Sequence, residues 1–270
     1  MNFIDRLNAR FHRLEMKPAN EARTSEPEEK LRRVYVWDLV VRLTHWLIAL
    51  SIFTLSYTGY FIGNPSVESP GEAGFLNTMG SYRLVHFYGA IVFTLSVLVR
   101  VYWMFFGSAP ARWPNFLPVT KKRLGDTKET LKFYLFMRKT YPPALSHNPM
   151  AGLTYLAVFG IYFLIIFTGL GLYGASASDS WLGFFAFFTE VFGGPQWARW
   201  IHHAGMWLLL AFFVHHFYSA VLASSIEKNG TLESIFTGYK WAPEHDIDQA
   251  GMEGKDADGK PTSEHKGETK

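Results

Sequence analysis

The chain contains no cysteine among its 270 residues. Disulfide bonds, thiolate zinc sites, iron–sulfur clusters held by cysteine and covalently attached c-type haem are therefore all excluded. Charged residues are also scarce, at 18% of the chain, whereas 49% of the residues are hydrophobic and 17% are aromatic. The first residues are mixed and charged, with no apolar core and no cleavage-like site, so we expect no secretory signal peptide there.

Long apolar runs hold most of the hydrophobic residues. Four of these runs are long enough to cross a hydrocarbon layer about 30 Å thick as helices. They cover about residues 41–63, 82–106, 151–173 and 201–222. The sequence therefore predicts an all-α membrane protein, in which residues 34–240 form a bundle of four transmembrane helices.

Polar segments flank this predicted bundle. Residues 1–33 combine an amphipathic stretch and an acidic linker. The stretch suits a helix on the membrane surface and equally suits a terminus that is frayed or docks on a partner, so both interpretations stay open. Residues 241–270 are rich in Asp, Glu, Lys and Gly, and we expect them to be a disordered tail.

Lysine and arginine are distributed unevenly between the polar segments. Nine lie between Arg6 and Arg42, eight lie between the second and third apolar runs, and six lie after the fourth run. The other two connections hold little more than Arg83 and Arg199, both at the edges of apolar runs. Because Lys and Arg concentrate in cytoplasmic loops, we predict a multi-pass protein of the bacterial inner membrane with both termini in the cytoplasm.

Four histidines lie in the fourth apolar run, two near each end. His202 and His216 are fourteen residues apart. At about 100° per residue they share one helix face, and at 1.5 Å per residue they are separated by about 21 Å. An imidazole is costly in hydrocarbon without a partner, so this face predicts two sites at two depths in the membrane.

Depth in the membrane matches these two histidines with two others. His86, near the outer start of the second run, is level with His202, and His45, near the cytoplasmic start of the first run, is level with His216. Two imidazoles on opposite sides of a flat macrocycle are a common axial set for b-type haem, and the interior of a helix bundle suits the apolar porphyrin. The sequence therefore predicts two non-covalent b-type haems, one near each side of the membrane.

Glycines and basic residues surround the predicted ligands. Gly89 and Gly205 each follow a ligand by three residues, and Gly59 shares the face of His45 at the outer depth, so each would leave room for a porphyrin. Arg100 shares the face of His86 at the inner depth, where a guanidinium would pair with a haem propionate. The other cofactor-binding candidates are Arg42, Arg83, Arg199 and His203. For the arginines, snorkelling to lipid head groups stays open as an alternative.

Two longer stretches resemble the b-type cytochrome subunit of membrane-bound nickel–iron hydrogenases, within the di-haem cytochrome b561-like group. Residues 42–59 begin Arg-Leu-Thr-His and end in Thr-Gly, and residues 199–216 begin Arg-Trp-Ile-His-His and end in His. The likeness covers about residues 33–239. Trp200 and Ala204 depart from the residue types usual beside the ligand pair, which bears on packing more than on ligation.

The resemblance implies the same two haem pairs and adds a role. In such complexes the large and small hydrogenase subunits lie on the outer face, and the iron–sulfur relay of the small subunit passes electrons to the outer haem. The inner haem then reduces menaquinone or ubiquinone near the cytoplasmic side. The chain would be an electron-transfer subunit and membrane anchor rather than an enzyme alone. Its partners would be hydrogenase, quinone and lipid, with no role for nucleic acid.

A quinone site near the inner haem would need polar side chains at that depth. His147 and Asn148, just before the third run, are the best placed, although Asn148 next to Pro149 also suits a simple helix cap. Tyr141 and Asp38 are weaker candidates.

Three other functions stay open on the sequence alone. The chain would equally suit the cytochrome subunit of a formate dehydrogenase or thiosulfate reductase. A haem-free proton relay or transporter would use the histidines to move protons, and a pure membrane anchor would use them in packing. These last two functions predict no change in visible absorbance on reduction.

Overall fold

The computed structural model describes residues 31–65, 78–108, 111–113, 149–177 and 180–243, together with residues 125, 128, 132, 137 and 247. Its elements in chain order are β1 (Leu31–Tyr35), α2 (Leu39–Gly63), α3 (Thr78–Phe106), α5 (Pro149–Ser176), η3 (Trp181–Ala186), α6 (Phe187–Val191), α7 (Pro195–Glu227), α8 (Thr231–Thr237) and β2 (Tyr239–Pro243). The amphipathic stretch predicted at the start of the chain lies outside the described residues.

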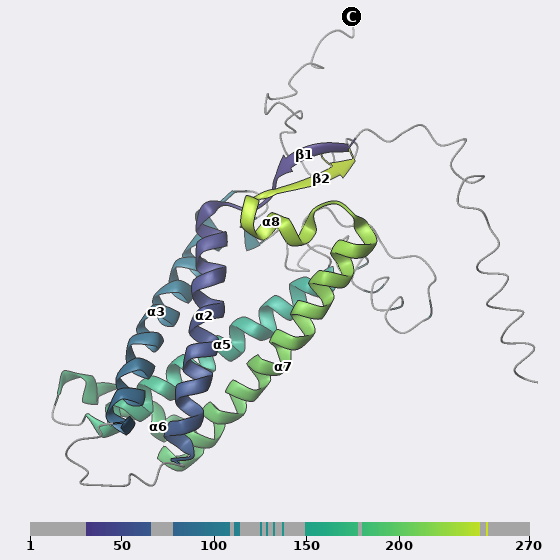
Figure 1. Ribbon diagram of the computed structural model, residues 1–270. Helices are drawn as coiled ribbons and strands as arrows, with labels where there is room; N and C mark the ends of the chain where they lie inside the picture. The colour runs from purple at the N-terminus through teal and green to yellow at the C-terminus, as the bar shows by residue number, and fades with distance from the viewer. Residues whose placement is uncertain are drawn as a thin grey trace, which may run out of the picture.

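The four longest helices, α2, α3, α5 and α7, form the body of the molecule (Figure 1). They have between 25 and 33 residues, and all four are long and apolar enough to cross a membrane. Large hydrophobic side chains are exposed along them, as expected where lipid rather than water is the neighbour. The predicted all-α bundle of four apolar helices is confirmed. Its helices extend beyond the predicted runs, most of all α7, which begins at Pro195 and ends at Glu227.

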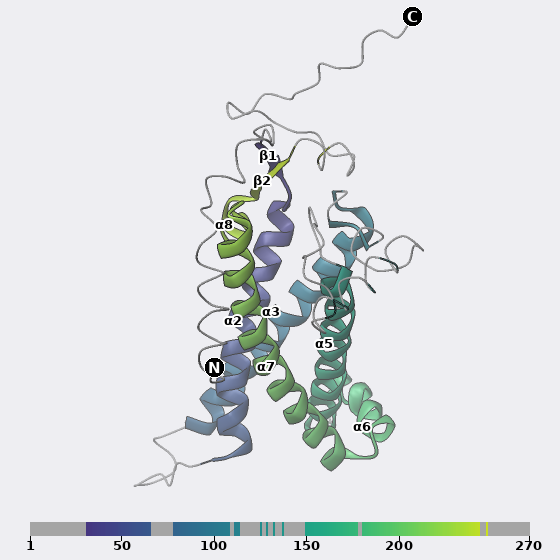
Figure 2. The same ribbon diagram turned by 90° about the vertical axis from the view of Figure 1, so that its right-hand side faces the viewer.

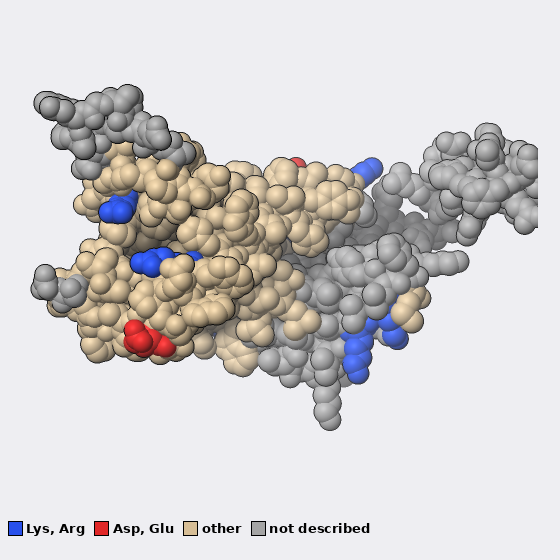
Figure 3. Space-filling view, turned by 90° about the horizontal axis from the view of Figure 1, so that it is seen from below, with Lys and Arg blue, Asp and Glu red and all other residues tan. Residues whose placement is uncertain are grey.

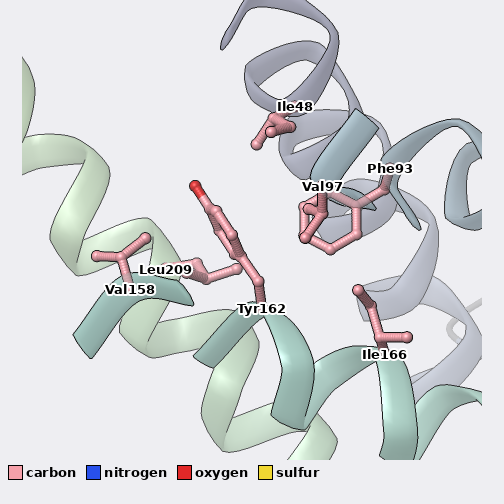
Figure 4. Packing of buried hydrophobic residues seen from close by; sticks show 7 residues of the cluster. All are labelled: Ile48, Phe93, Val97, Val158, Tyr162, Ile166 and Leu209. Atoms are coloured by element: carbon pink, nitrogen blue, oxygen red, sulfur yellow. The ribbon is translucent and has the colours of Figure 1, made fainter. Parts of the chain in front are cut away.

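The bundle consists of two helical hairpins. The helix α2 packs along α3, and α5 packs along α7, whereas contacts between α2 and α7 and between α3 and α5 are few. A cluster of buried side chains from all four helices joins the two hairpins (Figure 4). Its members are Ile48, Phe93, Val97, Val158, Tyr162, Ile166 and Leu209. Within it, Phe93 and Tyr162 meet edge to face with ring centroids 5.2 Å apart.

One end of the bundle, called here the strand end, carries an antiparallel pair of strands. β1 pairs with β2 in the register Leu31↔Pro243 to Tyr35↔Tyr239. Figures 1 and 2 show this pair beside α8, next to the start of α2 and the end of α7. The sequence interpretation expected no strand here and placed residues 241–243 in a disordered tail. The structure corrects this, because β2 continues to Pro243 and Ala242 is buried.

Specific contacts fasten α8 to the first helix. Arg42 of α2 donates a hydrogen bond from Nη1 to the carbonyl oxygen of Phe236. Trp37 donates its indole N–H to the hydroxyl of Ser234 at 3.0 Å, and the rings of Trp46 and Phe236 lie 4.9 Å apart. The chain segments before α2 and after α7 are therefore held together, although they are far apart in sequence.

The opposite end, called here the η3 end, carries η3 and α6 between α5 and α7. Both short helices pack against α5. Gly174 permits the close approach, because a Cβ there would lie 2.6 Å from the backbone nitrogen of Ala186. Viewed from this end, the described surface is mostly uncharged, with isolated basic and acidic side chains (Figure 3). Trp181, Phe184 and Val191 are exposed at this end, with exposed fractions of 79%, 73% and 70%.

Candidate functional site

His86 of α3 and His202 of α7 face each other near the η3 end. Their ring centroids are 6.4 Å apart and the ring planes are tilted by 59°. The two histidines come from different hairpins, so this contact depends on how the hairpins are packed. These are the two histidines that the sequence analysis paired because both were expected at the same depth in the membrane.

His45 of α2 and His216 of α7 form a second pair near the strand end. Their ring centroids are 6.3 Å apart and the ring planes are tilted by 55°. The His216 ring also stacks on Phe212 at 5.4 Å, and the His45 ring meets Trp46 edge to face at 5.3 Å. The helix α7 thus contributes one histidine to each pair.

The distance between the two rings of each pair can be compared with the distances expected for a shared metal ion and for a direct hydrogen bond. Bonds from imidazole nitrogen to a metal are about 2.0–2.1 Å, so two imidazoles on opposite sides of one metal ion have centroids about 6 Å apart. A direct hydrogen bond between the rings would bring the centroids to about 5 Å. The separations of 6.3 and 6.4 Å fit a shared metal better than a direct hydrogen bond.

The histidines meet in twos, not in larger clusters. Among the residues that the structure describes, no group of three or more His, Asp or Glu side chains converges as a metal site. Two imidazoles alone leave most metal ions with an incomplete coordination sphere, whereas a porphyrin supplies four further nitrogens. The donor set of each pair therefore fits haem, whose axial positions are the two that remain.

Two threonines contact the histidines near the η3 end. The Oγ1 atom of Thr58 lies 2.9 Å from Nδ1 of His86, and Oγ1 of Thr168 lies 2.9 Å from Nδ1 of His202. Both threonines are buried, with exposed fractions of 3% and 0%. Sequence reasoning missed both as site residues. Their one sequence signal was a Thr-Gly dipeptide in each of two apolar runs.

The glycines of these dipeptides lie against the same imidazoles. A Cβ at Gly59 would lie 3.1 Å from Cε1 of His86, and a Cβ at Gly169 would lie 3.1 Å from Cε1 of His202. Contacts this close would displace the rings. The structure therefore places the predicted site residue Gly59 beside the outer-depth pair and adds Gly169.

The other two predicted glycines have a different environment. A Cβ at Gly89 would meet the side chain of Leu55 at 3.3 Å, and a Cβ at Gly205 would meet Ile165 at 2.8 Å. Leu55 belongs to α2 and Ile165 to α5, the neighbours of α3 and α7 within each hairpin. These contacts favour close helix packing for Gly89 and Gly205, in place of the room for a porphyrin that the sequence suggested.

Arg100 of α3 is buried, with 4% of its surface exposed. Its Nη1 and Nη2 atoms have no hydrogen-bond partner among the described residues. The Nδ1 atom of His45 is also buried without such a partner, and the guanidinium lies within electrostatic range of this imidazole. An unpaired guanidinium is costly inside a membrane, so the site favours an anionic ligand, which the propionates of haem would provide.

The remaining basic candidates lie nearer the surface. Arg42 binds the carbonyl of Phe236, and Arg83 is exposed. Arg199 is exposed and donates to Oε1 of Gln196 at 3.2 Å. One end of the Arg42 guanidinium thus binds the last turn of α8, while its Nε atom is buried without a hydrogen-bond partner among the described residues.

His203 and the two quinone candidates complete the predicted set. Nδ1 of His203 lies 3.2 Å from the carbonyl oxygen of Arg199, and Nε2 faces Gly63 at the end of α2. His203 thus contacts α2, in agreement with a packing role. His147 and Asn148 lie outside the described residues.

The sequence matches a known protein family. The family described as "Prokaryotic cytochrome b561" matches residues 36–238. A protein of Azotobacter vinelandii named "Probable Ni/Fe-hydrogenase B-type cytochrome subunit" is 36% identical over 225 residues, which are 80% of this chain and 93% of that protein. A protein of Cupriavidus necator with the same name is 32% identical over 219 residues, covering 78% of this chain and 88% of that protein.

A third relative comes from Escherichia coli K12. It is named "Probable Ni/Fe-hydrogenase 1 B-type cytochrome subunit" and is 33% identical over 211 residues, which are 76% of this chain and 90% of that protein. The family match includes all four long helices and both histidine pairs. The chain belongs to the prokaryotic cytochrome b561 family.

Proposed function

We propose that this chain is the di-haem b-type cytochrome subunit that anchors a nickel–iron hydrogenase in the bacterial inner membrane and connects it to quinone. The relatives named above are called hydrogenase cytochrome subunits, and the likeness covers most of each protein. The observation that carries the proposal is the presence of two histidine pairs, at opposite ends of the bundle, with metal-compatible spacing.

The four paired histidines are the residues that would hold the haems. His86 and His202 would hold one b-type haem, and His45 and His216 would hold the other. Haem bound at each pair supplies a one-electron carrier. Arg100 would neutralise a propionate at the strand end, since its guanidinium is buried and has no hydrogen-bond partner among the described residues.

The protein between the two pairs separates them by a fixed distance. His202 and His216 lie on one helix, fourteen residues apart, which corresponds to about 21 Å along its axis. The buried cluster of seven side chains, among them Phe93 and Tyr162, lies on the four helices between the two levels. This apolar layer would exclude water and ions from the space between the two carriers.

The distribution of charge supplies the proposed orientation. Most Lys and Arg residues lie in the segments before α2, between α3 and α5, and after α7. The helix ends that flank these segments lie at the strand end (Figure 1), so the positive-inside rule assigns this end to the cytoplasm. The hydrogenase subunits would then dock outside, at the η3 end. Quinone would bind near the strand end, where His147 and Asn148 remain the proposed contacts just before α5.

The test is a reduced-minus-oxidised visible spectrum of the chain purified with its partners, with haem and protein quantified. We expect about two b-type haems per chain in the wild type, and about one after His86→Ala or His216→Ala. Hydrogen-dependent reduction of quinone should be lost in both variants, whereas reduction of a soluble dye by the hydrogenase should persist.

The matched control is His215→Ala. His215 lies next to a proposed ligand but about 100° away around α7, so this variant should keep both haems. A wild-type protein without haem, made with ample haem supply, would contradict the proposal. Retention of both haems in His86→Ala would contradict the ligand assignment.

A further inference from the structure

Thr58 and Thr168 occupy equivalent places beside the two histidines near the η3 end. Thr58 lies on α2 and contacts His86 of the next helix, and Thr168 lies on α5 and contacts His202 of the next long helix. In both contacts the threonine Oγ1 and the histidine Nδ1 are 2.9 Å apart. Two helices far apart in sequence thus present the same hydroxyl to the same ring atom.

The single hydrogen of each hydroxyl can be assigned from its other neighbour. Oγ1 of Thr58 lies 2.7 Å from the carbonyl oxygen of Thr54, and Oγ1 of Thr168 lies 2.7 Å from that of Leu164. A carbonyl cannot donate, so two oxygens this close need the hydroxyl hydrogen between them. Each threonine therefore has only lone pairs to offer the imidazole, and Nδ1–H of the histidine must be the donor.

This assignment determines which ring nitrogen is free. A neutral imidazole with its hydrogen on Nδ1 carries its lone pair on Nε2, the form that binds a metal through Nε2. We infer that Thr58 and Thr168 are positioning residues that hold His86 and His202 in the Nε2-ligating tautomer and fix the rotation of both rings. This inference rests on the proposed ligation of haem by these histidines.

The glycine after each threonine leaves space for the imidazole ring. Any Cβ at Gly59 or Gly169 would lie 3.1 Å from Cε1 of the adjacent imidazole. The glycine lets the ring lie close to the backbone of the neighbouring helix, and the threonine holds its Nδ1–H. Each Thr-Gly dipeptide thus positions a proposed ligand on the other long helix of its hairpin.

In the pair near the strand end, His45 lacks this support in the described part of the chain. Nδ1 of His45 is buried and has no hydrogen-bond partner there. A hydrogen bond from Nδ1–H makes a histidine a stronger electron donor to its metal, which favours the oxidised form. The His86–His202 site should therefore have the lower reduction potential of the two, so that electron transfer from the η3 end to the strand end is downhill.

The experiment is a redox titration of the purified hydrogenase–cytochrome complex, followed by visible absorbance and low-temperature EPR. Thr58→Val and Thr168→Val keep the branched shape but replace the acceptor oxygen with a methyl group. In each variant, and more in the double variant, we expect the lower midpoint potential to rise while the upper one stays in place. Haem affinity at that site should fall about tenfold or more.

Two further variants isolate the hydroxyl. Thr58→Ser and Thr168→Ser keep the acceptor and should restore the lower midpoint. Thr189→Val removes another buried threonine hydroxyl, which bonds the carbonyl of Ala186 at 2.7 Å, and should change neither midpoint.

The outcomes separate this inference from the proposed function. If the wild type holds two haems and the double valine variant keeps both with unchanged midpoints and EPR signals, the inference is overturned while the ligation stands. A shift confined to the upper midpoint would also overturn it, because the threonines would then act on the wrong site. A wild type without two haems would instead overturn the proposed function itself.

Discussion

Trp103, near the end of α3, donates its indole N–H to the carboxylate of Asp38, just before α2, with 2.7 Å between Nε1 and Oδ2. The same carboxylate oxygen accepts the backbone N–H of Ser108 at 3.2 Å. One side chain thus joins the first and last turns of the α2–α3 hairpin at the strand end. Asp38 was a weak candidate for quinone binding, and these contacts give it a structural role instead.

Replacement of this carboxylate should weaken the hairpin. Asp38→Ala leaves two donors without their acceptor, and the loss of a hydrogen-bond acceptor at a part-buried site costs about 1–3 kcal/mol of unfolding free energy. Thermal unfolding of the purified chain should therefore occur at a lower temperature, with a smaller decrease for Asp38→Asn, which keeps an acceptor oxygen. In a Trp103→Phe background the cost of Asp38→Ala should shrink, and an unchanged cost would argue against the coupling.

Replacement of glycine by alanine should affect haem binding only where the glycine lies against a histidine ring. Gly59→Ala and Gly169→Ala would push against the rings of His86 and His202, so each should lower the haem content of the site near the η3 end. At Gly160 of the same bundle no atom lies within 4 Å of an added Cβ. Gly160→Ala should keep both haems and stabilise α5 by up to about 1 kcal/mol. Equal haem loss in all three variants would point to a general loss of helix packing.

Arg100→Gln should act in opposite directions on the haem-free and haem-bound protein. Removal of a buried charge without a hydrogen-bond partner in the described structure should raise the thermal stability of the haem-free chain. The same change removes the proposed propionate partner and should weaken haem binding at the His45–His216 site. Haem titration followed by visible absorbance measures the second effect. Arg83→Gln, at an exposed position of the same helix, is the control and should change neither quantity.

The strand pair should support the site at its own end of the bundle. Val34 of β1 is 1% exposed and pairs with Lys240, whereas Leu31 of the same strand is 54% exposed. Val34→Asp places a charge in a buried apolar position and should release β2, with loss of haem at the nearby His45–His216 site only. Leu31→Asp should be tolerated. Limited proteolysis near residue 238 reports the release, and spectra report the haem content.

The absence of cysteine allows a direct test of orientation. Trp181 in η3 is 79% exposed, and Leu31 lies exposed at the strand end. In intact cells with a permeabilised outer membrane, a membrane-impermeant maleimide should label Trp181→Cys, while Leu31→Cys should react only after the inner membrane is opened. The wild type supplies a background of zero, since it has no thiol. The reverse labelling pattern would invert the proposed topology.

The sequence contained enough information for the four long helices but not for the strand pair. Apolar runs of membrane length predict α2, α3, α5 and α7 because a buried backbone has few other solutions in lipid. The sequence did not predict the two strands, because each has only five residues and the strand it pairs with lies about 200 residues away. The burial of Val34 depends on a segment whose composition, from residue 241 onward, had suggested disorder.

For the candidate site, too, the sequence predicted some features and missed others. The spacing of His202 and His216 on one helix indicated two levels, and depth indicated the partners that the structure places beside them. The contact of Thr58 with His86 depends on the rotation of α2 against α3, which periodicity alone does not determine. For Gly89 the sequence predicted room for a porphyrin, whereas the side chain nearest to an added Cβ is Leu55 of the neighbouring helix.

The two hairpins, taken as two halves of the bundle, repeat one contact. Exchange of the halves carries the Thr58–His86 contact onto the Thr168–His202 contact. The same exchange carries His216 onto Arg100, because each lies fourteen residues after the histidine of its half. The two halves therefore differ at the strand end: the first contributes the imidazole of His45 and the guanidinium of Arg100, and the second contributes the imidazole of His216.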